Sequence, residues 1–87
     1  MTVRSHTFRG KRYRILPSTR NTIGICENQH TKNKSMRIPI NGDTVGELGV
    51  IIHESLHACL WDLDEDSTID TADDIARLLV RLGWRKE

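Results

Sequence analysis

The sequence predicts an α+β fold in which a small antiparallel sheet of three strands is followed by two helices. Three observations predict it. Residues 1–42 contain short apolar runs separated by turn-forming residues, which is typical of strands. Residues 43–87 contain two capping signals, each followed by apolar residues at helical spacing. Because 87 residues form only a modest core, we expect a single domain, with a basic β-rich part (1–42) and a two-helix metal-binding part (43–87).

Three apolar runs in the first part are expected to form the strands. Residues 12–16 alternate between polar and apolar side chains, and residues 22–26 form a second short run. The third strand is expected at residues 36–40, where Pro39 lacks a backbone donor and favours an edge position or an irregular strand end. We expect the second and third strands to form a hairpin with a long polar loop over residues 28–34.

The first helix is expected at residues 45–60. Thr44 and Glu47 have the spacing of a capping box, in which the threonine side chain accepts a hydrogen bond from the third residue of the helix. Apolar residues then recur at intervals of three and four as far as residue 60. This spacing predicts a helix with one apolar face.

The second helix is expected to begin at another capping box, residues 62–65, and to continue to Leu82. Gly83 is placed as its C-terminal stop. Carboxylates are frequent along this helix, and its apolar residues predict one stripe that packs against the first helix. The stripe consists of Ile69, Ala72, Ile75, Ala76, Leu79 and Leu82.

Residues 53–57 have the sequence His-Glu-Ser-Leu-His, an H-E-x-x-H motif in the middle of the first helix. His53 and His57 are four residues apart, so they project from one face, one turn from each other, and both can bind a single zinc ion. Glu54 points to the same side and can hold the water bound to that ion. The alternatives are two ordinary histidines on a helix, or a metal site without hydrolytic activity.

A catalytic zinc site has three protein ligands and a water. No histidine follows His57 in the sequence, so a carboxylate of the second helix must complete the set. We expect Asp70 to be the third ligand, with Asp74 four residues later as the acceptor that orients a zinc-bound histidine. Asp73 and Glu65 are the alternative third ligands, and both lie nearer to the apolar stripe. Any of these carboxylates is also expected simply as an exposed acid near a helix start.

Residues 51–84, with the motif His53–His57 and the carboxylate-rich second helix, resemble the zincin metallopeptidases, and the gluzincin branch in particular. The compact layout is also similar to small phage and prokaryotic zincin-like proteins of the ImmA/IrrE type. The spacing of Asp70 and Asp74 matches the gluzincin pattern of a third ligand with an acid four residues on. The resemblance further implies a minimal zincin-like domain in which the strand at residues 36–40 lines the cleft and pairs with the substrate backbone.

The sequence therefore predicts a metallopeptidase that cleaves a protein or peptide with a Zn²⁺-activated water and Glu54 as general base. Residues 1–40 contain nine lysines or arginines and one acid, whereas residues 41–87 contain four and eleven. This asymmetry leaves two alternatives open. One is a zinc-stabilised binding module without catalysis, whose residues 1–40 contact nucleic acid or an acidic protein. The other is a pseudoenzyme.

A cytoplasmic location without membrane attachment is expected. No hydrophobic run approaches the ~20 residues of a membrane span, and residues 1–10 contain no apolar segment of a secretory signal. Cys26 and Cys59 are too few and too far apart to form a disulfide framework, which fits a reducing compartment. The sequence leaves the oligomeric state undefined.

Overall fold

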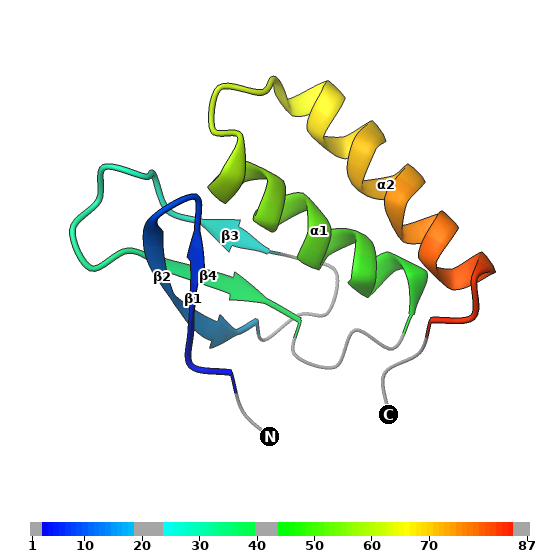
Figure 1. The fold of residues 1–87 in the computed structure, drawn as a ribbon, viewed down its shortest axis with the longest axis horizontal. Helices are drawn as coiled ribbons and strands as arrows, with labels where there is room; N and C mark the ends of the chain where they lie inside the picture. Colours follow the sequence, from blue (N-terminus) through cyan, green and yellow to red (C-terminus); the bar gives the residue numbers. More distant parts are fainter. Residues whose placement is uncertain (1–2, 19–23, 40–43, 85–87) are drawn as a thin grey trace.

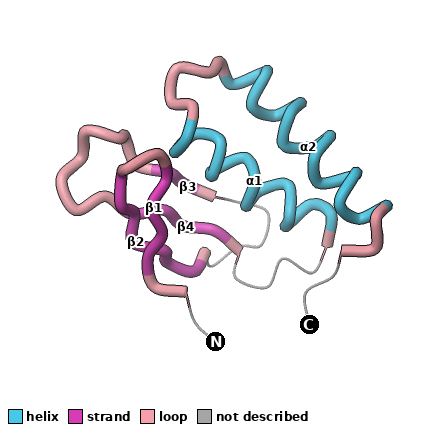
Figure 2. The backbone as a smooth tube through the Cα atoms, viewed as in Figure 1, coloured by secondary structure: helices cyan, strands magenta, loops and turns pink. Residues whose placement is uncertain are grey.

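Four strands and two helices form an α+β unit in the computed structural model, which describes residues 3–18, 24–39 and 44–84 (Figure 1). Both helices lie on one side of the sheet, with α1 next to the sheet and α2 packed on α1 (Figures 1 and 2). The sheet has the strand order β1-β2-β4-β3. The elements are β1 (Ser5–Phe8), β2 (Lys11–Pro17), β3 (Ile25–Cys26), β4 (Ser35–Ile38), α1 (Val45–Cys59) and α2 (Glu65–Arg81).

The sheet differs from the predicted three antiparallel strands because it has a fourth strand at its beginning. β1 pairs antiparallel with β2, so that His6 lies opposite Tyr13. The turn between them contains Arg9 and Gly10, both with positive φ (47° and 78°). Positive φ at both central residues is the property of turns that match the twist of a hairpin. Arginine is an unusual residue at the first of these positions, so residues 9–10 lack the usual signature of such a turn.

The sheet is also mixed, and this corrects the prediction a second time. β2 and β4 run parallel, with Arg14 opposite Ser35, whereas β3 and β4 form the predicted antiparallel hairpin. β4 lies between β2 and β3, so of the two alternatives expected for residues 36–40 the edge position is wrong and the strand end remains, while residue 40 lies outside the described residues. Pro39 follows the last residue of β4 and is buried, so its missing donor falls just after the strand end. The free edge beside α1 belongs to β3.

The core lies between the sheet and α1. Tyr13 of β2, Met36 of β4 and Ala58 of α1 are each 0% exposed. The Tyr13 hydroxyl donates a hydrogen bond to the backbone oxygen of Glu27 (3.4 Å), which satisfies its polar end inside the core. Burial raises the pKa of Tyr13 to about 12, so this hydroxyl keeps its proton. The core residues hold β2, β4 and α1 together independently of α2.

The helices agree closely with their predicted limits. Thr44 caps α1 by accepting a hydrogen bond from the Glu47 N–H (3.1 Å). Asp64, rather than Asp62, caps α2 and accepts from the Ser67 N–H (2.9 Å). Gly83, with φ of 90°, follows α2 as predicted. None of the helices in the described part of the chain has both the length and the apolar composition that crossing a bilayer requires.

The contact between α1 and α2 uses small side chains. Thr68, Ala72 and Ala76 are the buried residues of α2. Gly49 of α1 faces this contact, and a Cβ there would lie in ordinary van der Waals contact with the Cβ of Ala76, at 3.9 Å. Of the other members of the predicted stripe, Leu79 is partly buried, whereas Ile69 (41%), Ile75 (38%) and Leu82 (73%) are exposed. The fully buried part of α2 is therefore made of small side chains.

Candidate metal centre

The two histidines of the motif lie together near the C-terminal end of α1. Their ring centroids are 4.7 Å apart, and the Nε2 atoms of His53 and His57 are separated by 3.0 Å. Both side chains are partly exposed, at 20% and 27%. The helix thus presents two imidazole nitrogens to one point at the surface, as the four-residue spacing requires.

The third member of the cluster is Glu65, the first residue of α2. Its Oε1 lies 2.9 Å from Nε2 of His53, and its Oε2 lies 3.1 Å from Nε2 of His57. The connection at residues 60–64 is short, and a hydrogen bond from the Leu63 N–H to the Leu60 oxygen (2.9 Å) tightens it. His53, His57 and Glu65 each offer one possible ligand atom, and these three atoms all lie within 4.8 Å of one another. They form the group of this kind found in residues 3–18, 24–39 and 44–84.

Asp70, our expected third ligand, is not part of this cluster. It lies five residues after Glu65, which at 100° per residue turns its side chain about 140° around the helix axis. Because Glu65 faces α1, Asp70 faces away from it, and its side chain is exposed. The choice of Asp70 followed the family spacing of two acids four residues apart. The structure instead brings the alternative, Glu65, to the histidines because the short connection places the start of α2 beside the end of α1.

The two remaining carboxylates also lie away from the histidines. Asp74, expected to orient a bound histidine, pairs with Arg77 at the exposed surface of α2 (3.7 Å). The Oδ1 atom of Asp73 lies 3.5 Å from the position of a Cβ on Gly49, close to the first turn of α1. Gly49 lies one turn before His53 on α1. Asp73 therefore lies next to α1 but outside the cluster.

The three contacts within the cluster cannot all be hydrogen bonds when Glu65 is ionised. A proton on both Nε2 atoms satisfies the two contacts with the carboxylate, but it leaves no acceptor for the 3.0 Å contact between the two nitrogens. With only one of these protons, an imidazole lone pair faces a carboxylate oxygen. A cation among the three groups removes this conflict, because each group then contributes a lone pair.

The donor set also fits zinc. Imidazole nitrogen and carboxylate oxygen are ligands of catalytic zinc sites, and tetrahedral bonds of 2.0–2.1 Å place the ligand atoms about 3.3 Å apart. The observed separations, 2.9 to 3.1 Å, are within a few tenths of an ångström of this value. Three protein ligands leave a fourth position for water or substrate. His53, His57 and Glu65 are therefore the residues that would hold the ion.

Glu54 is buried behind the cluster, with 7% of its surface exposed. Burial raises the pKa of its carboxyl, the nearby charge of Glu65 raises it further, and His57 opposes the change. The backbone at Gly24 covers the side chain so closely that a Cβ there would lie 2.6 Å from Cγ of Glu54. The side chain is therefore held in one position between α1 and the backbone at Gly24.

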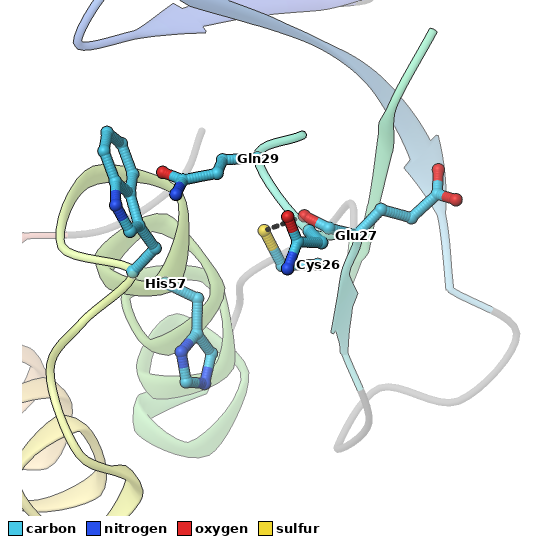
Figure 3. Close-up of a pocket in the computed structure, with 6 residues that line it drawn as sticks. Cys26, Glu27, Gln29 and His57 are labelled. Atoms are coloured by element: carbon cyan, nitrogen blue, oxygen red, sulfur yellow. Dashed lines mark hydrogen bonds between the residues drawn. The ribbon is translucent and has the colours of Figure 1, made fainter. Parts of the chain in front are cut away.

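A cavity of about 200 Å³ adjoins His57 (Figure 3). In Figure 3, the side chains of Cys26 and Gln29 point into this space, whereas the Glu27 carboxylate points away. Burial raises the pKa of the Cys26 thiol to about 11, so it is protonated at neutral pH and is not a nucleophile. Sequence reasoning missed this cavity because its lining comes from distant segments: Cys26, Glu27, Asn28, Gln29, His57 and Trp61.

The open edge of β3 leads to this cavity. The Glu27 N–H donates to the Ser35 oxygen of β4 (3.1 Å). Backbone groups alternate in direction along a strand, so the N–H and C=O of Cys26 point to the opposite side, where no strand of the described residues pairs with β3. These two groups can pair with an extended segment of another chain.

Comparison of the chain with protein-family models, curated proteins and solved structures gave no match. The geometry of the described residues is therefore the basis for assigning a function.

Proposed function

We propose that this chain is a zinc-dependent metallopeptidase of the zincin type. The observation that carries the proposal is the convergence of His53, His57 and Glu65 within 3.1 Å of one another, next to the buried Glu54. Zinc bound by these residues would polarise the scissile carbonyl and lower the pKa of a bound water. Glu54 would then serve as the general base that takes a proton from the attacking water and returns it to the leaving amine.

An extended peptide pairs with the free edge of β3 in this proposal. The outward N–H and C=O of Cys26 supply the backbone hydrogen bonds. This assigns the role expected for residues 36–40 to a different strand, because β4 is bonded on both sides. A peptide on β3 passes the cavity beside His57, which brings its carbonyl groups toward the metal ligands.

The cavity takes one substrate side chain. A cavity of about 150 Å³ holds a benzene molecule, so the volume of about 200 Å³ here suits a side chain of medium size. Trp61 supplies an apolar wall. The Oε1 atom of Gln29 is buried without a hydrogen-bond partner among the described residues, and such an atom favours a ligand that donates a hydrogen bond.

Metal analysis combined with peptide cleavage tests this function. The parent chain is expected to purify with about one zinc ion and to cleave members of a mixed peptide library, with the products identified by mass spectrometry. Glu54→Gln is expected to keep the zinc and lose cleavage, because the amide cannot accept the proton. A parent chain without metal, or a Glu54→Gln variant that cleaves at the parent rate, would contradict the proposal.

A further inference from the structure

The face of the sheet that the helices leave uncovered is basic. Tyr13 points into the core, so its neighbours Arg12 and Arg14 point to the opposite face of β2. Arg37 points to the same side, because its neighbour Met36 is buried in the core. All three arginines are exposed. We call Arg12, Arg14 and Arg37 the basic sheet face.

A cavity of about 680 Å³ lies at one end of this face, lined by Arg12, Arg14, Asn33 and Lys34. The loop that forms one wall is tied to β2, since the Arg14 N–H donates to the Lys34 oxygen (3.0 Å) and its Nη2 donates to the Asn33 oxygen (3.3 Å). Asn33 has φ of 54°, which fixes the turn of the loop. The described lining residues include three cations and no acid, so the cavity attracts anions.

Glu27 is an acid beside this surface, close enough to interact with Arg14 and Arg37. Its Oε1 accepts hydrogen bonds from the N–H and the hydroxyl of Ser35, both 2.7 Å. These bonds, with weaker attraction from Arg14 and Arg37, lower the pKa of Glu27. The carboxylate is thus already engaged and offsets only part of the positive charge. The exposed acids gather on α2 instead, on the far side of α1 (Figure 1).

We propose that the basic sheet face binds the phosphate backbone of duplex nucleic acid. Guanidinium groups match phosphate oxygens with paired hydrogen bonds, and contacts of this kind fix position without reading sequence. The described aromatic side chains of the sheet, Phe8 and Tyr13, pack on the core side. Bases of a single strand therefore find no ring to stack on. Charge and side-chain type favour a duplex, and binding is independent of its sequence and of the metal centre.

The test is fluorescence anisotropy of a labelled DNA duplex over a series of salt concentrations. The double variant Arg12→Gln/Arg14→Gln removes two cations of the basic sheet face. The matched control, Arg77→Gln/Arg81→Gln, removes the same charge from α2. If two phosphate contacts are lost, affinity falls about tenfold or more at low salt, and the slope of log affinity against log salt decreases in magnitude by about 1.8. The control variant is expected to bind within about twofold of the parent, because charge on α2 lies away from the bound backbone.

Several outcomes would overturn the proposal. These are no binding by the parent chain, equal weakening by the two double variants, or a single strand bound more tightly than the duplex. Tighter binding of polyglutamate of the same total charge would identify an acidic polypeptide as the occupant and would also overturn it. Circular dichroism of each variant verifies folding. Zinc content is measured separately, so that a failure of duplex binding can be distinguished from a failure of the proposed peptidase function.

Discussion

The sheet and the helix pair are held together in different ways. The sheet shares with α1 a core that includes the large, fully buried side chains of Tyr13 and Met36. α2 instead meets α1 through Ala72, Ala76 and Thr68, while apolar residues such as Leu82 remain exposed. Burial of apolar surface is the main stabilising contribution in folding. The sheet is thus held to α1 by large buried side chains, whereas α2 is held to α1 by small ones. We therefore expect α2 to depend more than the sheet on the contacts of Glu65 at the candidate metal centre.

Removal of the metal is expected to have the largest effect and to act unequally on the two regions. A ligand at a thousandfold excess over its Kd stabilises a fold by about 4 kcal/mol. Treatment with a chelator, or the substitution His53→Ala, is therefore expected to increase amide exchange along α2 far more than in β2 and β4. Hydrogen exchange followed by mass spectrometry measures this, with Asp70→Asn as the control. A uniform increase across the chain would show that the two regions do not differ in this way.

Gly24→Ala is expected to affect catalysis next most strongly. The new methyl group would lie 2.6 Å from Cγ of Glu54 and 2.8 Å from Cγ1 of Val50, so the Glu54 carboxylate must shift. Misplacement of a reacting group by about 1 Å lowers rates about 100-fold. Cleavage should fall while zinc content stays the same.

Gly46→Ala is the matched control for that substitution. Among the described residues, a Cβ on Gly46 would meet only the Thr44 hydroxyl oxygen, at 3.8 Å, and alanine is a better helix former than glycine in this first turn of α1. This variant should retain full cleavage and be slightly more stable. Equal losses of cleavage in the two variants would mean that the rate does not depend on the position of Glu54.

Thr44→Ala should lower the free energy of unfolding by about 1 kcal/mol, because the Glu47 N–H loses its capping acceptor. Urea unfolding measures this value. The loss should be the same with and without chelator, because the cap lies at the end of α1 away from the histidines. A loss found only with metal bound would link this cap to the metal centre.

The smallest expected effect is on the acid stability of α2. Hydrogen bonds from Ser67 lower the pKa of Asp64 in the folded chain. Its stabilising contribution is therefore complete above the ordinary aspartate pKa, about 3.9, and is lost as the pH falls through the lower folded value. Asp64→Asn should make unfolding less dependent on pH in this acid range. An unchanged pH profile of thermal unfolding would argue against a role for this carboxylate.

Local signals were sufficient for the helices but not for the sheet. Thr44 and Gly83 act within one turn of the helix ends that they define, so α1 and α2 were predicted nearly to the residue. The parallel pairing of β2 and β4 depends on contacts between distant segments, and the Arg9-Gly10 turn lacks the usual residue signature. These features could not be read from neighbouring residues.

The candidate site divides in the same way. His53, Glu54 and His57 lie within one helical turn, so their proximity follows from helix geometry. The choice between Glu65 and Asp70 depends on how the two helices are joined, and the four-residue spacing of Asp70 and Asp74 carries no information on that. The short connection at residues 60–64 is the signal that could have identified Glu65, because it places residue 65 near residue 57. The cavity residues Gln29 and Trp61 meet only in the folded chain.

The zinc affinity of Glu65→Gln, set against that of Asp70→Asn, tests the central claim most directly. Both substitutions replace a carboxylate of α2 with its amide, and competition with a chromophoric chelator measures each dissociation constant. The arrangement of His53, His57 and Glu65 predicts that Glu65→Gln binds zinc at least about tenfold more weakly than the parent chain, by analogy with the 10–100-fold cost of losing a supporting group, while Asp70→Asn binds as the parent does. The opposite order, or a parent chain that binds no zinc, would contradict the metal centre described above.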